Sequence, residues 1–461
     1  MTHASLSFDR GTLRIDGHVA PFGDLVRFDD RTGFHRAPAH HYSALIDRAR
    51  AARVSLSDDV PTASRSDRPG VAPPSLRPYQ EQALAAFETF GKRGVIALPT
   101  GSGKTRVACA AIARARTSTL VLVPTRPLLE QWASVLEATF GAPIGVVGDG
   151  MKRLEDITVM TFESAFRCLD RFGDRFAMLV VDEAHHLAGG RRSEAVEMCP
   201  APVRLGLTAT PPWPGTSAAE RLRDLVGPVV FELEIADLAG RALAPLDVVR
   251  IHIDLTREER ATYERDVARF HDLRREVLRT SPDADWATCV RAIARMPSGG
   301  DVLSAMYRAG ALAAFPEAKR TAVHQLLARH REDRTLLFTA TARDAHIIGR
   351  EALVPVITSD VGRAERTSIL SAFRERRVRA ICSAQVLNEG VDVPEASVAI
   401  IVAGALGARE HVQRVGRILR PGVDKRAVAY ELITIDTVDE ARHRARRRRL
   451  ATGRSAARIG A

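Results

Sequence analysis

One stretch of this sequence decides the fold, and it reads Leu98-Pro99-Thr100-Gly101-Ser102-Gly103-Lys104-Thr105. An apolar run at 95–98 leads into it and a helix-like segment at 106–115 follows it, which is the strand, loop and helix order of a phosphate-binding loop. The glycines allow backbone N–H groups to face phosphates, the ammonium group of Lys104 suits the β and γ phosphates, and the hydroxyl of Thr105 suits Mg²⁺. The first residue stands where the strict loop pattern has a glycine, so a second motif is needed before the stretch predicts a nucleotide site.

The second motif is Asp182-Glu183-Ala184-His185, which follows the apolar run 178–181. Ligands of open parallel sheets bind at the carboxyl ends of the strands, so these side chains are expected beside the phosphate loop. The sequence predicts that Asp182 holds Mg²⁺ through water and that Glu183 polarises the water that attacks the γ phosphate of ATP. An alternative is that His185 and His186 bind a metal, but adjacent side chains are expected to point apart and no third ligand is evident. His185 is instead predicted to link the nucleotide to a second domain.

Short apolar runs alternate with helix-like segments in two parts of the chain, which is the rhythm of parallel α/β sheets. The first part has runs at 95–98, 119–123, 157–160, 178–181 and 204–207, and the second has runs at 335–338, 378–382, 398–402 and 427–432. Between them, the segment 256–279 has the pattern of an amphipathic helix in which Thr256 and Glu259 can form a capping box. We therefore predict two α/β domains that are separated by a helical insertion.

The composition indicates a globular protein with a polyanionic partner. At 461 residues the chain is long enough for about three domains, and its 45% hydrophobic and 27% charged residues are typical of globular proteins. The formal net charge of +11 favours nucleic acid, because Lys and Arg displace the counterions of phosphates. Charge alone leaves open an ordinary basic protein that binds no nucleic acid.

The cysteines predict neither a disulfide framework nor a zinc site, because all five are scattered without a CxxC spacing. The first residues carry charges where a signal peptide would be apolar, and no apolar run approaches the roughly 18 residues of a membrane span. We expect a cytoplasmic protein with reduced thiols and no membrane contact.

Four motifs, in this order, resemble motifs I, II, III and VI of superfamily 2 helicases of the DEAD/DEAH-box type. They are 99–105 (PTGSGKT), 182–185 (DEAH), 208–210 (TAT) and 413–420 (QRVGRILR). The remaining motifs of that superfamily resemble 123–126 with 131–132 (Ia), 161–164 (Ib), 337–340 (IV) and 388–394 (V). The resemblance covers about 76–432, and it implies an α/β fold with two tandem RecA-like parallel-sheet domains.

The resemblance also implies an ATP site that is divided between the two domains. Arg417 and Arg420 resemble paired arginine fingers of the second domain, which reach the γ phosphate only when the domains close. A surface salt-bridge cluster is the alternative for these two arginines. The residues implied in nucleotide binding, with Gln80 reading adenine, are Arg77, Gln80, Thr100, Gly101, Ser102, Gly103, Lys104, Thr105, Gly390 and Asp392. The residues implied in coupling hydrolysis to movement are His185, Thr208, Thr210, Gln413 and Arg414.

Nucleic-acid contacts in such motors go mainly to the backbone, so they are independent of base sequence and sensitive to salt. The resemblance implies these contacts for Thr125, Arg126, Thr161, Thr339 and Asn388. The threonines have a structural alternative, because threonine also caps helices that follow strands.

Several segments are similar to the XPB branch of the superfamily, which contains translocases associated with DNA repair and transcription. They are 76–80, 130–132, 205–210 and 227–232, together with 36–40 and Tyr42 near the N-terminus. The branch implies a small N-terminal damage-recognition-like α+β domain at 1–70, a RecA-like domain at 75–235, a connector and helical thumb-like insertion at 236–318, a second RecA-like domain at 319–440 and a basic tail at 441–461. One motif departs from the branch, because Thr210 is followed by Pro211 and not by an Arg-Glu-Asp motif. The resemblance therefore implies movement along DNA more directly than strand separation.

The motifs together predict an ATP- and Mg²⁺-dependent DNA helicase or translocase with 3′–5′ polarity, which acts in DNA repair as a monomeric motor. Single-stranded or forked DNA is its expected substrate, and a nuclease is a further expected partner. Three alternatives stay open: the motor subunit of a restriction or phage-defence system, an RNA helicase, and a non-catalytic scaffold that binds nucleic acid. The presence of Lys104, Asp182, Glu183, Arg417 and Arg420 argues against the scaffold.

Overall fold

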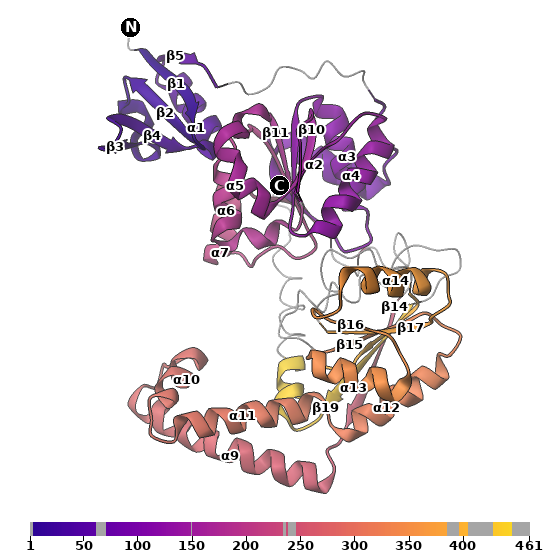
Figure 1. Ribbon diagram of the computed structural model, residues 1–461. Helices are drawn as coiled ribbons and strands as arrows, with labels where there is room; N and C mark the ends of the chain where they lie inside the picture. The colour runs from indigo at the N-terminus through magenta and orange to yellow at the C-terminus, as the bar shows by residue number, and fades with distance from the viewer. Residues whose placement is uncertain are drawn as a thin grey trace. The chain divides into compact units, whose positions relative to one another are not determined.

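The computed structural model describes residues 3–60, 71–148, 150–233, 237, 246–384, 396–403 and 427–444 (Figure 1). These residues form two compact units, of which the first ends at Asp237 and the second, in its described part, begins at Leu246. Each unit has hydrophobic cores of its own. In the described ranges, no helix has both the length and the apolar character that crossing a membrane requires.

A small α+β domain opens the first unit. Its elements are β1 (His3–Asp9), β2 (Thr12–Gly17), η1 (Ala20–Leu25), β3 (Arg27–Asp29), β4 (Phe34–Pro38), η2 (Ala39–His41), α1 (Tyr42–Ala51) and β5 (Ser55–Asp58). The strands pair in the order β3-β4-β2-β1-β5, with β1 and β5 parallel and the other pairs antiparallel. Alternate apolar residues of the central strands, such as Leu6 and Leu13, share one face and form a core with Leu45 of α1. The small α+β domain that the resemblance implies is therefore present.

A large parallel sheet forms the rest of the first unit. Its strands are β6 (Arg93–Ala97), β7 (Thr119–Val123), β8 (Gly145–Gly148), β9 (Met151–Arg153), β10 (Ile157–Thr161), β11 (Met178–Val181), β12 (Val203–Thr208) and β13 (Val229–Glu232). They pair in the order β13-β6-β12-β11-β7-β10-β8-β9, and every pair is parallel except β8 with β9. Strands β7, β10 and β11 are buried at every position, which is typical of a parallel sheet with both faces covered.

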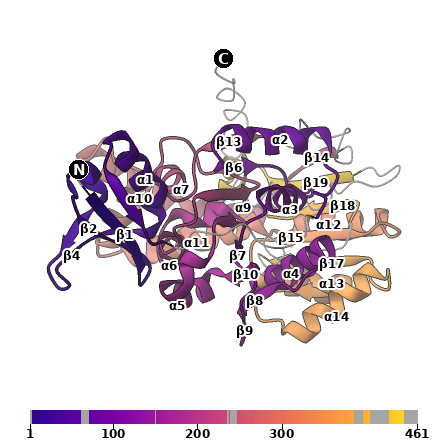
Figure 2. The ribbon, with the colours of Figure 1, turned by 90° about the horizontal axis from the view of Figure 1, so that it is seen from above.

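Helices cover the two faces of this sheet in two layers. They are α2 (Pro78–Thr89), α3 (Lys104–Ala115), α4 (Arg126–Phe140), α5 (Phe162–Phe172), η3 (Gly173–Arg175), η4 (Ala184–Ala188), α6 (Arg191–Glu197) and α7 (Ser217–Leu225). One face packs on α2, α3 and α4, and the other packs on α5, α6 and α7, as Figure 2 shows on the two sides of the strands. This arrangement leaves the carboxyl ends of the strands to carry the loops that contain the motifs, which is the RecA-like architecture that the sequence predicts.

The helical insertion lies in the second unit and consists of α9 (Arg257–Thr280), α10 (Trp286–Ala294) and α11 (Gly299–Ala314). The capping box forms at the start of α9, where Thr256 Oγ1 accepts from the amide of Glu259 at 3.2 Å and Glu259 Oε2 accepts from the amide of Thr256 at 3.0 Å. Apolar residues on one face of α9, such as Phe270, are buried in cores that they share with α10 and α11. The helix that the pattern predicts at 256–279 is confirmed.

In the described residues, the second sheet has six parallel strands. Its elements are β14 (Leu246–Ile253), α12 (Glu317–Arg329), β15 (Thr335–Thr339), α13 (Ala342–Ala352), β16 (Val356–Ile357), α14 (Arg363–Arg374), β17 (Ala380–Ala384), β18 (Val398–Ile401) and β19 (Ala427–Thr434). The strand order is β14-β19-β18-β15-β17-β16.

Strand β14 corrects one boundary that the sequence implies. It lies within 236–318, which the sequence assigns to connector and insertion, yet all of its residues pair with β19. The helical insertion therefore interrupts the second sheet domain and does not precede it. A local pattern misses this strand because β19, with which it pairs, lies at the other end of the domain's sequence.

Candidate nucleotide site

The phosphate-binding loop connects β6 to α3, whose first residue is Lys104. Gly101 and Gly103 have φ angles of +84° and +85°, a left-handed region that favours glycine. A Cβ atom at Gly103 would lie 2.6 Å from Gln80 Nε2, so this position also has no room for a side chain. The ammonium group of Lys104 lies over the loop and donates to the carbonyl oxygen of Leu98 at 3.1 Å. The loop thus presents an ammonium group and the N-terminal N–H groups of α3 to one region, as an anion site requires.

The start of α2 supports this loop from beneath. Gln80, which is buried, donates from Nε2 to the carbonyl oxygen of Ser102 at 2.7 Å, and the hydroxyl of Tyr79 donates to the same oxygen at 2.7 Å. The Oε1 atom of Gln80 accepts from the amide of Arg77 at 2.9 Å and caps the helix. The side-chain nitrogen of Gln80 carries two N–H donors, and the second one could contact adenine. That contact stays a prediction. The sequence does not single out Tyr79, because nothing near it in the chain indicates that it reaches the loop.

The acidic pair lies at the carboxyl end of β11, as expected for the DEAH motif. Asp182 is 7% exposed, and its Oδ2 accepts from Trp132 Nε1 of α4 at 2.7 Å while its Oδ1 accepts from the amide of Glu183 at 3.0 Å. Burial, reinforced by the negative charge of Glu183, raises the pKa of Asp182 to about 6. Two adjacent carboxyl groups that share a buried site in this way are suited to a cation.

Glu183 has a strained backbone, with a φ of +48° in the left-handed region that residues with side chains seldom adopt. Its Oε2 is buried and, within the described residues, accepts no hydrogen bond, although His185 Nδ1 lies 3.4 Å away. Strain of this kind persists where the surroundings hold a residue in a functional position. The geometry thus leaves one carboxylate oxygen of Glu183 without a hydrogen bond among the described residues.

His185 joins the acidic motif to the TAT motif at the end of β12. Its Nδ1 forms a hydrogen bond with Thr208 Oγ1 at 3.0 Å, and that oxygen also accepts from the amide of Thr210 at 3.1 Å. The expectation that His185 and His186 point apart is wrong, because their ring centroids are 4.3 Å apart in the short helix η4. In the described part of the chain, these two histidines still belong to no cluster of three metal-ligating groups.

Two of the three threonines that the sequence assigns to nucleic acid form hydrogen bonds within the protein. Thr161 caps α5, since its hydroxyl accepts from the amide of Ser164 at 3.2 Å. Thr339 is buried and donates to the carbonyl oxygen of Thr341 at 2.9 Å, while Thr125 stands at the N-cap of α4, before Arg126, with a buried hydroxyl oxygen. Their contact with nucleic acid stays a prediction. The predicted residues Asn388, Gly390, Asp392, Gln413, Arg414, Arg417 and Arg420 lie outside the described residues.

Trp132 is the residue of this site whose role the sequence misses. It belongs to motif Ia, yet its indole N–H contacts a carboxylate 50 positions later in the chain. The side chain is 1% exposed and lies in the core between α4 and the sheet. A buried tryptophan ordinarily indicates packing alone, so only the fold shows that it also holds Asp182.

Comparison with known proteins places these features in a family. Residues 6–60 match the Xeroderma pigmentosum group B helicase damage recognition domain, 74–213 match the Type III restriction enzyme res subunit, and 318–422 match the helicase conserved C-terminal domain. The DNA 3′-5′ translocase XPB2 of Sulfurisphaera tokodaii is 34% identical over 373 residues, or 81% of this chain and 84% of that protein. The chain belongs to the XPB family of superfamily 2 helicases. The resemblance inferred from the motifs is confirmed.

Other XPB-family relatives extend beyond the region that matches. The DNA 3′-5′ helicase XPB of Mycobacterium tuberculosis is 28% identical over 80% of this chain and 63% of its own length. The putative DNA 3′-5′ helicase Rad25 of Halobacterium salinarum is 30% identical over 82% of this chain and 57% of its own length. This XPB-family chain therefore spans less than two thirds of these two relatives.

Solved structures agree with the fold. The helicase domain of Pyrococcus furiosus Hef has a TM-score of 0.53 at 17% identity and covers 80% of this chain and 98% of its own. Dbp5 of S. cerevisiae, bound to RNA and ADP BeF3, has a TM-score of 0.56 at 16% identity and covers 81% of this chain and 87% of its own. At these identities the likeness supports the fold of an XPB-family motor and says nothing of the substrate.

Proposed function

We propose that this protein is an ATP-dependent DNA translocase with 3′–5′ polarity, which moves along DNA and unwinds or remodels it during DNA repair. The observation that carries the proposal is that Lys104, Asp182 and Glu183 follow strands at the same edge of one sheet. The chain that carries them belongs to the XPB family. The match of 6–60 to a damage recognition domain supports repair as the setting.

The residues of the first domain can perform the hydrolytic part of this activity. Lys104 and the N-terminal amides of α3 bind the phosphates of ATP, because they concentrate positive charge at the end of the loop. Glu183 orients a water molecule and takes up its proton at the carboxylate. His185 transmits the state of Glu183 to Thr208 and Thr210 through its hydrogen bond.

A magnesium ion fits the donors present, and Thr105 with Asp182 would hold it. Asp182 carries a buried carboxylate beside a second carboxylate, and Trp132 fixes its orientation, as supporting groups do for metal-binding carboxylates. When bound, Mg²⁺ neutralises the charge that develops on the β and γ phosphates. Arg417 and Arg420 complete the proposed site from the second domain, so that hydrolysis depends on closure of the two domains.

Replacing Trp132 with phenylalanine should weaken the use of Mg²⁺ while leaving the core filled. Loss of a group that supports a metal ligand typically costs about 10- to 100-fold in metal affinity. We expect the Mg²⁺ concentration that half-saturates ATP turnover to rise by that factor, with most of kcat recovered at high Mg²⁺. Trp213→Phe, which changes a half-exposed tryptophan, is the control. An unchanged Mg²⁺ dependence in Trp132→Phe would remove Trp132 from the site.

DNA should stimulate ATP turnover of the purified protein, and salt should reduce the stimulation because phosphate contacts release counterions. The measurement compares single-stranded, duplex and forked DNA with RNA of the same sequence. Displacement of streptavidin from the 5′ end but not from the 3′ end of single-stranded DNA would report 3′–5′ movement. Triplex displacement without duplex opening would separate translocation from unwinding. Stimulation by RNA and by neither form of DNA would replace the proposal with an RNA helicase.

A second candidate is the motor subunit of a restriction system, which the match of 74–213 to a restriction-enzyme subunit favours. Such a subunit would act with a nuclease, and a repair motor also commonly needs one, so we propose a nuclease partner in either case and a monomeric motor. Affinity purification from the native cell distinguishes the two, since co-purification of a methyltransferase would favour restriction.

A further inference from the structure

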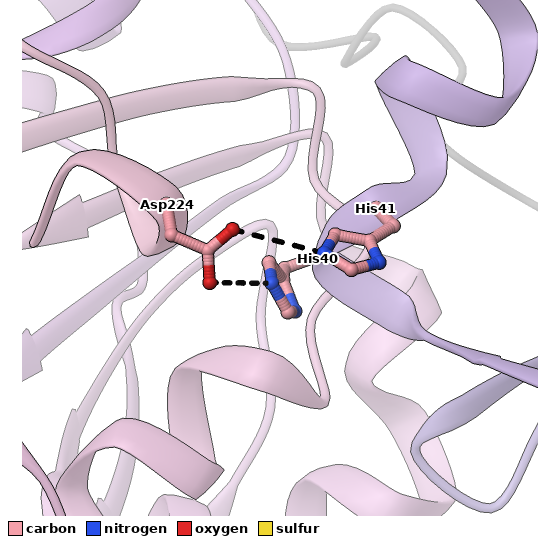
Figure 3. A group of neighbouring side chains, drawn as sticks. All are labelled: His40, His41 and Asp224. Atoms are coloured by element: carbon pink, nitrogen blue, oxygen red, sulfur yellow. Dashed lines mark hydrogen bonds and ion pairs between the residues drawn. The ribbon is translucent and has the colours of Figure 1, made fainter. Parts of the chain in front are cut away.

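We propose that His40, His41 and Asp224 bind one Zn²⁺ ion, which fastens the N-terminal domain to the first RecA-like domain. Both histidines come from η2 of the small domain and the carboxylate comes from α7 of the RecA-like domain, as Figure 3 shows. Imidazole nitrogens and carboxylate oxygens are common ligands of Zn²⁺. All three residues lie outside the helicase motifs, so the inference does not depend on the proposed function.

The spacing of the three groups is compatible with a metal, and only one of the two histidines is close enough to Asp224 for a hydrogen bond. Asp224 Oδ2 lies 3.3 Å from His40 Nε2, Asp224 Oδ1 lies 3.7 Å from His41 Nε2, and one candidate ligand atom from each residue lies within 4.8 Å of the others. A separation of 3.7 Å is too long for a hydrogen bond. Zinc bonds of about 2.0–2.1 Å in a tetrahedron place neighbouring ligand atoms about 3.3–3.4 Å apart. Small side-chain movements would therefore complete three corners of a zinc tetrahedron.

The two imidazole rings of this cluster present the same ring nitrogen, Nε2, to Asp224. His40 is 3% exposed, and the Nδ1 atoms of both His40 and His41 are buried without a hydrogen-bond partner among the described residues. The centroids of the two rings are 4.1 Å apart. Both rings turn their Nε2 atoms to the carboxylate of Asp224. An ion that binds both Nε2 atoms and the carboxylate would contact all three groups at once.

One arginine contacts the carboxylate of Asp224, and a second contacts the backbone beside it. Arg221 Nη1 donates to Asp224 Oδ2 at 2.9 Å and also pairs with Glu197 of α6, so the guanidinium is anchored on both sides. Arg204 is fully buried and donates to the carbonyl oxygen of Leu225 at 2.7 Å, which fixes the end of α7 that carries Asp224. A ligating carboxylate is usually held by such a second partner. The ligand on the RecA-like side is therefore positioned before any ion arrives.

The test uses the full chain after removal of metals with a chelator, and Zn²⁺ alone as the probe. We expect one equivalent of Zn²⁺ to bind and to raise the thermal unfolding temperature, because a ligand that binds only the folded state stabilises it. Mg²⁺, which prefers six oxygen ligands, should not replace it at this site. Co²⁺ in its place should give the visible absorption of a tetrahedral nitrogen and oxygen site.

Variants identify the ligands. His41→Gln and Asp224→Asn change partly exposed residues and should each lower Zn²⁺ affinity by at least the 10- to 100-fold that loss of a mere supporting group costs. Two control variants are His35→Gln, in the same small domain, and Glu183→Gln, at the nucleotide site. Each should still bind one equivalent of Zn²⁺ with unchanged affinity. Circular dichroism checks that each variant is folded, and the Co²⁺ spectrum of the unaltered protein provides evidence that needs no variant. Failure to bind one equivalent, or full binding in both ligand variants, would overturn the proposal.

Discussion

Glu183→Gln is expected to abolish ATP turnover while leaving the protein folded and able to bind nucleotide. The glutamine amide cannot accept the proton of the attacking water, and loss of a general base typically lowers the rate by about 10²- to 10⁴-fold. The change keeps the size of the side chain, so the left-handed backbone at this position costs no more than before. It also removes a negative charge beside the buried carboxyl of Asp182, so stability should not fall.

The measurement is single-turnover ATP hydrolysis with saturating DNA, together with nucleotide affinity and the unfolding temperature. Lys104→Ala should lose turnover as well, but through weakened phosphate binding, so its nucleotide affinity should fall where that of Glu183→Gln does not. Glu137→Gln, on the exposed side of α4, is the matched control and should retain full activity. Hydrolysis that survives in both Glu183→Gln and Lys104→Ala would show that the nucleotide site has been assigned to the wrong residues.

Lys319→Met is expected to destabilise the second sheet domain by about 3–5 kcal/mol, the usual cost of removing one partner from a buried ion pair. Lys319 is fully buried at the start of α12, and its ammonium group donates to Asp439 Oδ2 at 2.8 Å and to the carbonyl oxygen of Val402 at 2.7 Å. Methionine fills similar space but leaves the carboxylate of Asp439 buried without its cation. The pair joins α12 to the segments that follow β18 and β19.

Hydrogen exchange of the β18 and β19 amides, followed by mass spectrometry, measures this loss within the second domain itself. Arg320→Met is the control, because Arg320 pairs with Glu351 at the surface and such pairs contribute about 0–1 kcal/mol. The double variant Lys319→Met with Asp439→Leu should regain part of the stability, since no buried charge remains. Equal effects of Lys319→Met and Arg320→Met would refute the special role of the buried pair.

Most of the fold follows from patterns that are local in the sequence. Runs such as 119–123 and 178–181 are apolar throughout because both faces of a parallel strand are buried, so they predict the strands of the first sheet directly. Thr256 and Glu259 lie three positions apart, and their capping box fixes the start of α9. The pattern does not predict strand β14, because most of its residues are exposed and its pairing with β19 is long-range.

The candidate site likewise has features that the sequence predicts and features that it does not. Gly101, Gly103 and Lys104 act within one turn of backbone, so their spacing alone predicts the loop. The hydrogen bond from Trp132 to Asp182 forms only because α4 packs against the sheet, so no spacing of residues in the sequence predicts it. The contact between the tilted rings of His185 and His186 depends on the short helix η4, which turns both side chains to one side where an extended chain would separate them.

By itself, the sequence determined the family, the phosphate loop and the acidic pair, because each depends on side chains and backbone within a few residues of one another. Only the tertiary structure decided how Asp182 is oriented and that Glu183 is strained. It alone also brings His40 to Asp224 across 184 positions of the chain, with His41 beside it. The physical reason is that a contact between distant residues is set by the packing of whole helices and sheets. That packing is the sum of many weak interactions, none of which leaves a pattern beside the residue concerned.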